Sequence, residues 1–271
     1  MFSQPSILEL ENLISAIKTE QSLDLKDYCE LAMYRQFKRL LKNKQTDASS
    51  IINRVGDFAF YDELVNSMII DQTEFFRDPT FWSELKTKLF PKMLAEKPNL
   101  TIWIPSTSSG EELYSLLIVL HESNALDKVK IIGSEIHKAK FTVVKNGLYG
   151  FKKVAIGKKN YERYCGQAKD IPFLTDMGGR FKMDNSILAN VEFQKNKLGY
   201  DTPPGQFDFI LCRNVILSQS LKLANKSYRI LKDSLKAGGY IALGNREKFQ
   251  SAYYESKFTF YNEAERIYKK K

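Results

Sequence analysis

Residues 101–112 read Thr101-Ile102-Trp103-Ile104-Pro105-Ser106-Thr107-Ser108-Ser109-Gly110-Glu111-Glu112. This stretch decides the fold: an apolar run leads into a loop of small residues, and two acids begin the next helical segment. In an open parallel sheet, ligands bind at the carboxyl ends of the strands, and small loop residues let a ligand approach the backbone. Glu111 and Glu112 suit the positive end of a helix, and they would repel a phosphate group. The stretch therefore disfavours a dinucleotide site and a P-loop.

A ligand that carries an ammonium group would instead be attracted to Glu111 or Glu112. The aminocarboxypropyl tail of S-adenosylmethionine has such a group. A helix that places acids near its positive end for stability alone would explain the same residues, so this stretch by itself leaves both interpretations open. The next apolar run ends at Glu135, where Rossmann-like folds commonly place an acid that binds ribose hydroxyls. A solvated loop acid is the alternative for Glu135.

From residue 100 onward, short apolar runs alternate with helical segments. The alternation predicts a mostly parallel sheet covered by helices on both faces, an α/β fold. Residues 258–261 and 266–268 would add an antiparallel strand or hairpin at the edge of the sheet. We expect strands at residues 100–104, 129–136, 191–194, 207–212 and 240–243, and helices at residues 110–123, 138–146 and 219–236.

Two other regions depart from this alternation. Residues 6–70 show only helical periodicity, with segments from residue 6, over 25–41 and over about 48–60. Residues 156–190 are rich in glycine, which predicts a small antiparallel insertion rather than a crossover helix. The expected domains are a helical N-terminal domain at 1–72, a linker helix at 73–98 and the sheet domain at 99–271, with the insertion at about 156–190.

The second helical segment has one basic face, formed by Arg35, Lys38, Arg39 and Lys42. This face is the best candidate for docking an acidic partner, because charged rims raise association rates. An ordinary solvated helix face is the alternative. The net charge of +9 also favours acidic partners, but the lysines are spread through the whole chain and so give only weak local fields.

Composition excludes several other classes of protein. Cys29, Cys165 and Cys212 are odd in number and far apart, so a disulfide framework is not expected and the cytosol fits best. His121 and His137 form no zinc-ligand spacing with a cysteine, and no Gly-x-Ser-x-Gly elbow is present. No apolar run approaches the roughly 18 residues of a membrane helix, and the first residues lack the pattern of a secretory signal. We therefore expect a cytoplasmic protein without a metal site.

Several stretches, taken together in their order and spacing, resemble the CheR family of chemotaxis receptor methyltransferases. The resemblance extends over roughly residues 60–250. It implies a Rossmann-like, S-adenosylmethionine-dependent methyltransferase sheet with a helical N-terminal domain and a small antiparallel β insertion. The stretches are Thr73-Glu74-Phe75-Phe76-Arg77-Asp78-Pro79, residues 103–115 (WIPSTSSGEELYS), Asn146-Gly147-Leu148-Tyr149, Val191-Glu192-Phe193, residues 207–215 (FDFILCRNV), Gly238-Gly239 and Gly244-x-x-Glu247.

The resemblance also implies an activity and a partner. The family transfers the methyl group of S-adenosylmethionine to glutamate carboxylates on the cytoplasmic helices of chemotaxis receptors, and S-adenosylhomocysteine is the product. A monomer that binds no nucleic acid and inserts into no membrane is expected. The basic face at Arg35, Lys38, Arg39 and Lys42 would dock the receptor.

The resemblance assigns site residues by position. Arg77 would lie near the reactive methyl as the catalytic residue, and Leu198 would lie over the adenine. An arginine that only caps or pairs beside Asp78 is the alternative for Arg77. The cofactor pocket would be formed by Thr73, Arg77, Gly110, Glu111, Glu112, Glu135, Leu198, Arg213 and Asn214.

The sequence departs from the family pattern at five positions. Asp71 replaces an asparagine, Glu135 an aspartate, Lys197 an asparagine, Leu113 a proline and Ser218 an aromatic residue. A glutamate keeps the ribose chemistry with a longer reach, whereas the missing aromatic could have helped to place the methyl or the substrate. These changes leave open a catalytically impaired, S-adenosylmethionine-binding sensor or scaffold of the same family.

A nucleic-acid methyltransferase is a third hypothesis, motivated by the positive charge. Such enzymes carry an Asn-Pro-Pro-aromatic motif after the fourth strand of the sheet. This chain has Arg213-Asn214-Val215 at that place instead. The sequence therefore favours a protein substrate.

Overall fold

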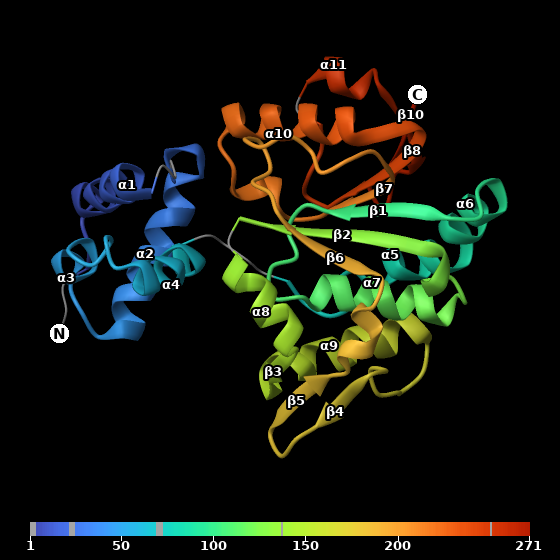
Figure 1. Cartoon of the computed structure of the whole chain (residues 1–271), viewed down its shortest axis with the longest axis horizontal. Helices are drawn as coiled ribbons and strands as arrows, with labels where there is room; N and C mark the ends of the chain where they lie inside the picture. Colours follow the sequence, from blue (N-terminus) through green and yellow to red (C-terminus); the bar gives the residue numbers. More distant parts are fainter. Residues whose placement is uncertain (1–3, 22–24, 69–72, 137, 250) are drawn as a thin grey trace. The chain divides into compact units, whose positions relative to one another are not determined.

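The computed structural model describes residues 4–21, 25–68, 73–136, 138–249 and 251–271 (Figure 1). The chain divides into two compact units. The first contains Met1–Asp71 with Ile216–Lys226, and the second contains Gln72–Val215 with Ser227–Lys271. Among the described residues, no helix is both long and apolar enough to cross a membrane.

The first unit is helical. Its helices are α1 (Ile7–Gln21), η1 (Leu25–Asp27), α2 (Glu30–Lys44), α3 (Ala48–Ile52) and α4 (Phe58–Met68). They enclose an apolar core that includes Leu13, Phe37 and Leu64. The segment from η5 (Ile216–Ser218) into α10 (Leu221–Ser234) joins this unit, because the Cys29 amide donates to the Ser218 carbonyl at 2.8 Å and Leu223 packs in the same core.

Two helix expectations in this unit are wrong in detail. The helix expected over residues 25–41 begins only at Glu30, after the short turn η1. The helix expected over residues 48–60 is two helices. Asp47 caps α3 by accepting from the Ser50 amide at 2.8 Å, and Asp57 accepts from the Phe60 amide at 3.3 Å at the start of α4. Two acids with separate capping bonds therefore mark two helix starts where the apolar pattern suggested one.

The second unit is built on a seven-stranded sheet with the order β6-β2-β1-β7-β8-β10-β9. The first five strands run parallel, and β10 pairs antiparallel with both β8 and β9. This confirms the mostly parallel sheet and the antiparallel hairpin at its edge. The strands are β1 (Leu100–Ile104), β2 (Val129–Glu135), β6 (Val191–Lys195), β7 (Phe207–Cys212), β8 (Leu235–Leu243), β9 (Phe258–Asn262) and β10 (Ile267–Lys270).

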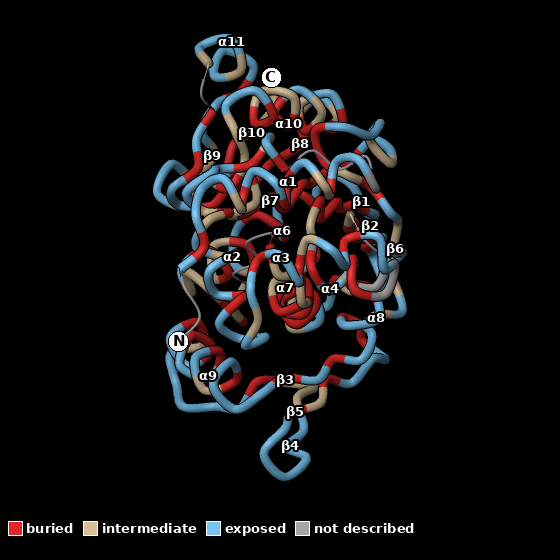
Figure 2. The backbone as a smooth tube through the Cα atoms, turned by 90° about the vertical axis from the view of Figure 1, so that its left-hand side faces the viewer, coloured by how far each residue is buried: buried red, intermediate tan, exposed pale blue. Residues whose placement is uncertain are grey.

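Helices cover both faces of this sheet. In Figure 1, α10 lies on one face and α7 on the other. Figure 2 shows α7 as largely buried, in agreement with the apolar core that includes Ile102, Leu117 and Phe209. The other helices of this unit are α5 (Pro79–Glu84), the π-helical turn η2 (Leu85–Leu89), α6 (Phe90–Glu96), α7 (Glu111–Glu122), η3 (Leu126–Lys128), α8 (Lys138–Asn146), α9 (Phe151–Cys165), η4 (Asn185–Leu188) and α11 (Ala252–Glu255).

A small antiparallel sheet has the order β3-β5-β4, with β3 (Leu148–Gly150), β4 (Leu174–Asp176) and β5 (Arg180–Met183). It confirms the antiparallel insertion, but the interpretation of residues 156–190 as an insertion rather than a helix is wrong for their first part, since α9 extends to Cys165. Gly157 does not break this helix. It lies inside α9 where a Cβ atom would meet the Phe75 Cβ at 2.8 Å, so the glycine allows close packing.

Candidate functional site

Most of the residues singled out in the sequence lie where the parallel strands of the large sheet end, which we call its carboxyl edge. Glu135 ends β2, Leu198 follows β6, and Arg213 with Asn214 follows β7. The loop of small residues follows β1. Because these strands are parallel neighbours, their carboxyl ends meet at the same edge. The strand order reverses at β1, between β2 and β7, which is where ligands bind in open α/β sheets.

Gly110 fixes the turn from β1 into α7. Its φ of +98° is in the left-handed region, and a Cβ atom there would meet the Tyr149 hydroxyl at 2.9 Å. The same hydroxyl donates to the Ser109 carbonyl at 2.8 Å, and the Thr107 amide donates to the Ser134 carbonyl at 3.1 Å. The loop is thus tied to β2 on one side and to β3 on the other, and its backbone passes close to both.

Glu135 is only 2% exposed and points into this loop. One carboxylate oxygen accepts from the Ser106 hydroxyl at 3.0 Å and from the Ser108 amide, and the other lies 3.7 Å from the Lys140 Nζ. Burial raises the pKa of Glu135 to about 7, although these hydrogen bonds oppose the rise. The acid therefore lies at the predicted place at the end of β2. The sequence analysis did not predict these loop partners, although the serines among residues 106–109 were a signal for them.

The two acids at the start of α7 face different neighbours. Glu111 is fully buried, forms an ion pair with Lys153 of α9, and accepts from the Ser109 hydroxyl at 2.6 Å. Glu112 lies 3.3 Å from a guanidinium nitrogen of Arg213. Burial raises the pKa of Glu112 to about 7; Arg213 opposes the rise and Glu247 adds to it. Of the two acids, Glu112 faces the carboxyl end of β7.

Arg213 connects three segments. Its side chain is fully buried, and one guanidinium nitrogen pairs with Asp78. The other forms an ion pair with Glu112, donating to it at 3.3 Å, and also donates to the Arg77 carbonyl at 3.4 Å. The guanidinium lies 4.2 Å from the ring centre of Phe81. Asp78 thus pairs with Arg213, whereas the capping alternative from the sequence had placed it with Arg77. The Arg77 side chain is half-buried, and its charge helps to lower the pKa of Glu112.

Asn214 has a φ of +59°, which is uncommon for a residue other than glycine. Its amide and that of Gly244 both donate to one oxygen of Glu247, at 2.7 and 2.8 Å. A Cβ atom at Gly244 would meet the Asn214 side-chain nitrogen at 2.6 Å. Glu247 is only 3% exposed, so this acid fixes the turn after β7. The sequence showed Glu247 only as part of a motif and did not assign it a role.

Three buried side-chain atoms that follow these strands find no hydrogen-bond partner within the described part of the chain: Ser108 Oγ, Asn196 Oδ1 and Arg213 Nε. Thr73 Oγ1, before α5, also has none among the described residues. Buried polar atoms are rarely left unpaired, since each such atom costs about 1–3 kcal/mol. Both donors and acceptors are represented. A ligand with hydroxyl, amine and carboxylate groups fits this set, as S-adenosylmethionine would.

The remaining positions are less informative. Leu198 is 7% exposed, and the Lys197 Nζ lies 3.6 Å from the ring centre of Tyr200. Ser218 belongs to the first unit, where its carbonyl accepts from the Cys29 amide. Asp71 lies outside the described residues.

The side chains of the basic face of α2 are all exposed: Arg35, Lys38, Arg39 and Lys42. Lys38 donates to the Gln4 side chain at 2.8 Å.

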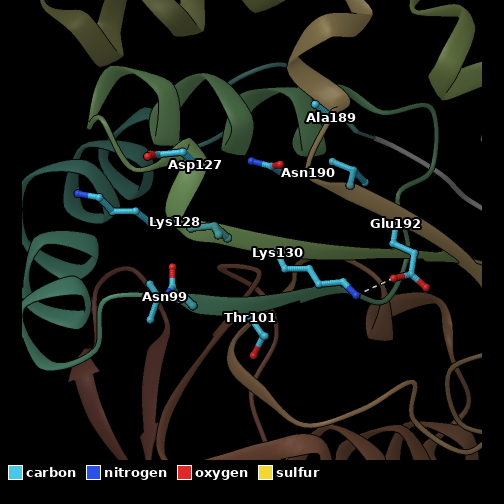
Figure 3. A pocket seen from close by; sticks show the side chains of 11 residues that line it. Asn99, Thr101, Asp127, Lys128, Lys130, Ala189, Asn190 and Glu192 are labelled. Atoms are coloured by element: carbon cyan, nitrogen blue, oxygen red, sulfur yellow. Dashed lines mark ion pairs between the residues drawn. The ribbon is translucent and has the colours of Figure 1, made fainter.

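A pocket of about 500 Å³ lies at the opposite edge, at the amino ends of β1, β2 and β6 (Figure 3). Two of its polar side chains have partners. Lys130 pairs with Glu192 at 2.9 Å, and the Asn190 side-chain nitrogen donates to the Leu126 carbonyl at 2.6 Å. Strand ends of this polarity are not where open α/β sheets bind ligands. This pocket therefore does not lie where an open α/β sheet is expected to bind its ligand.

Comparison with known proteins identifies the family of this chain. A family model described as "CheR methyltransferase, SAM binding domain" matches residues 71–265. A Pseudomonas putida protein named "Putative methyltransferase Cher3" is 26% identical over 265 residues, which cover 97% of this chain and 97% of that protein. A chemotaxis protein methyltransferase of Vibrio parahaemolyticus is 30% identical over 190 residues, which cover 68% of this chain and 66% of that protein.

Among solved structures, one similar chain is SAM-bound CalS10, an amino pentose methyltransferase from Micromonospora echinaspora. It aligns with a TM-score of 0.35 and 12% identity, over 62% of this chain and 52% of that chain. PKMT2 from Rickettsia typhi in complex with AdoHcy aligns with a TM-score of 0.35 and 16% identity, over 64% of this chain and 26% of that chain. At these scores, the choice of family depends on the sequence comparisons.

Proposed function

The chain belongs to the CheR family of S-adenosylmethionine-dependent methyltransferases, and from this premise we propose that it methylates glutamate side chains of chemotaxis receptors. The proposed site of action is the cytoplasm, where the chain would act as a monomer on the helices of a receptor. The observation that carries the proposal is Glu112. It is a partly buried acid, 16% exposed, at the start of α7 and at the carboxyl ends of the strands, and it suits an ammonium ligand.

The proposed cofactor site uses the residues at that edge. Glu112 would hold the ammonium group, Glu135 the ribose hydroxyls, and Leu198 would cover the adenine. Bound S-adenosylmethionine supplies a methyl group that its sulfonium already activates. The unpaired atoms at Ser108 and Arg213 support a polar ligand in this space. The residues proposed to line the site are Thr73, Arg77, Gly110, Glu112, Glu135, Leu198, Arg213 and Asn214. Glu111 is omitted because Lys153 and Ser109 occupy both of its carboxylate oxygens, whereas Arg213 occupies only one of those of Glu112.

The proposed substrate needs little chemical help from the chain. A glutamate carboxylate is ionised at pH 7, because its pKa is about 4.3, so no general base is required. Catalysis then depends on holding the carboxylate oxygen about 3–3.5 Å from the methyl carbon and on excluding water. Arg77 is the proposed orienting group, since a guanidinium can bind a carboxylate through two parallel hydrogen bonds.

The basic face of α2 is the proposed receptor-docking surface. Its four basic side chains are exposed on the same helix. Because they are positively charged, this surface attracts acidic helices. The residues are Arg35, Lys38, Arg39 and Lys42. Docking on charged side chains would make receptor methylation sensitive to salt.

A transfer assay tests the proposal. Purified protein is incubated with radiolabelled S-adenosylmethionine and cytoplasmic receptor fragments, and base-labile methyl esters are measured. Ester formation that is lost in Arg77→Ala, while S-adenosylhomocysteine still binds, is the expected result. Cofactor binding with no transfer to any receptor fragment would contradict the proposed activity. That outcome would favour the sensor or scaffold hypothesis, to which Lys197 and Ser218 point.

A further inference from the structure

Asp78 departs from the usual geometry of a helix N-cap. It occupies the N-cap position of α5, directly before Pro79, where an aspartate normally accepts a hydrogen bond from the first turn. Its side chain makes no such bond, and its backbone is left-handed, with φ of 55° and ψ of 73°. A left-handed residue other than glycine costs about 1–2 kcal/mol. Such local costs are concentrated at functional sites, so the contacts that Asp78 does make are informative.

The contact that Asp78 makes is with Arg213. The Arg213 guanidinium lies between two acids and forms an ion pair with each: one nitrogen pairs with Asp78, and the other donates to one oxygen of Glu112 at 3.3 Å. It is fully buried, so water cannot screen its charge. A buried guanidinium needs a carboxylate partner, because an unpaired buried charge is expensive. Without Asp78, Glu112 would be the nearest acid left to neutralise it.

This competition matters for the cofactor. On the proposed function, Glu112 must offer its carboxylate to an ammonium group. A carboxylate that is already bound bidentately by Arg213 offers less negative charge to that group. We propose that Asp78 is a positioning residue: by holding one guanidinium nitrogen of Arg213, it limits Arg213 to a single oxygen of Glu112 and leaves the other oxygen available to the ammonium group of S-adenosylmethionine. This inference rests on the proposed cofactor site.

A purely structural role for Asp78 makes a different prediction, and two ligands separate the two roles. S-adenosylhomocysteine carries the ammonium group, whereas 5′-deoxy-5′-methylthioadenosine has the same adenosine and thioether but lacks the aminocarboxypropyl chain. Loss of fold would weaken both ligands alike. Loss of positioning would weaken only the ligand that needs Glu112.

The experiment measures both affinities by calorimetry on the full chain. Asp78→Asn should weaken the binding of S-adenosylhomocysteine by about tenfold to a hundredfold, the range expected for one charge-assisted interaction. It should leave methylthioadenosine within about twofold. Asp78→Glu, which keeps the charge, should restore most of the loss. Asp170→Asn makes the same chemical change at a side chain that is 82% exposed, and should bind both ligands like the wild type.

Each other outcome overturns a specific statement. Equal weakening of both ligands, unchanged S-adenosylhomocysteine binding, or no recovery in Asp78→Glu overturns the positioning role. Asp78→Ser is measured in parallel as a second neutral variant; if neither neutral variant folds, Asp78 serves the fold and the inference fails. A wild-type protein that binds neither ligand contradicts the proposed cofactor site itself, which is a separate result.

Discussion

Glu112 and Glu135 are the two acids whose protonation most affects this site. Burial raises the pKa of each to about 7, so each is poised between its charged and neutral forms near physiological pH. Desolvation favours the neutral form, and only specific hydrogen bonds or cationic ligands favour the charged one. Buried acids with raised pKa values gather at functional sites more often than at structural ones.

The first residue-scale prediction concerns Glu112 and pH. Only its ionised form attracts an ammonium group, so the affinity for S-adenosylhomocysteine should fall as the pH is lowered through 7. With a pKa of about 7 in the free protein, about a tenth of Glu112 is ionised at pH 6, which weakens binding by up to about tenfold relative to pH 8. Calorimetry at pH 6, 7 and 8 measures this slope.

The control for that slope is Glu112→Gln. It should bind weakly at pH 8, by about tenfold or more, and lose most of the pH dependence. The charges of Arg213 and Arg77 lower the pKa of Glu112, and that of Glu247 raises it. An unchanged slope in Glu112→Gln would assign the titration to another group, of which Glu135 is the first candidate.

The second residue-scale prediction concerns Glu135 and stability. Its folded pKa of about 7 lies above the ordinary 4.5, so the unfolded chain loses this proton first and stability falls as the pH rises from 4.5 to 7. At 1.36 kcal/mol per pKa unit, that loss reaches about 3 kcal/mol. Glu135→Gln should therefore raise the free energy of unfolding by about 1–3 kcal/mol at pH 8 and change it little at pH 5. Urea unfolding at both values checks this; a destabilised variant at pH 8 would contradict it.

The sequence predicted an acid for the ammonium group but could not choose between Glu111 and Glu112. Neighbouring residues on a helix point about 100° apart, so the two side chains meet different elements. Lys153 of α9 and Arg213 after β7 decide between them, and both come from distant parts of the chain. Periodicity within α7 carries no information about either neighbour.

At the scale of elements, the buried strands were the most predictable part. The runs expected at residues 100–104 and 207–212 match β1 and β7, because a strand buried on both faces is apolar throughout. Helix α9 was missed because Gly157 looked like a helix breaker, whereas its packing against Phe75 explains it. Expectations failed where a residue was chosen for a tertiary contact rather than for local propensity.

The element-scale prediction compares two glycines. Gly110 and Gly166 both have positive φ, of +98° and +73°, so alanine strains the backbone at either position. At Gly166 nothing lies within 4 Å of the added Cβ, whereas at Gly110 the Tyr149 hydroxyl lies at 2.9 Å. Gly166→Ala should therefore cost about 1–2 kcal/mol with unchanged S-adenosylhomocysteine binding.

Gly110→Ala should cost more, by about 1–3 kcal/mol for the added clash, and should also weaken the ligand because it displaces the loop before α7. Thermal unfolding and calorimetry on the two variants give both quantities. Equal effects of the two substitutions would show that the Tyr149 contact does not constrain the loop.

At the scale of the molecule, the two edges of the large sheet differ in electrostatics. At the amino edge, Asp208 binds Lys97, Thr101 and Lys236, and these hydrogen bonds lower its pKa to about 2 even though burial opposes them. That carboxylate is occupied by hydrogen bonds within the fold. At the carboxyl edge, Glu112 and Glu135 keep pKa values of about 7. One edge therefore holds the fold together, and the other retains the charge that a ligand can use.

A receptor could respond to the net charge of +9 of the whole chain or to the local charge of one surface. The last prediction separates the two. Arg35→Glu combined with Arg39→Glu reverses the basic face of α2. This variant should lower kcat/KM for receptor fragments by about tenfold or more at low salt, because steering by a rim of charges acts on association. It should bind S-adenosylhomocysteine like the wild type.

The matched control is Lys18→Glu combined with Lys26→Glu, which changes the net charge equally at exposed positions of the same unit but outside α2. If the face itself docks the receptor, this control keeps most of the wild-type rate and the wild-type salt dependence, while the α2 variant loses both. If only net charge matters, the two variants decline together, and raising the salt to about 0.5 M removes the difference from wild type in both. Methylation rates at two salt concentrations therefore decide whether α2 is a docking surface or a solvated helix.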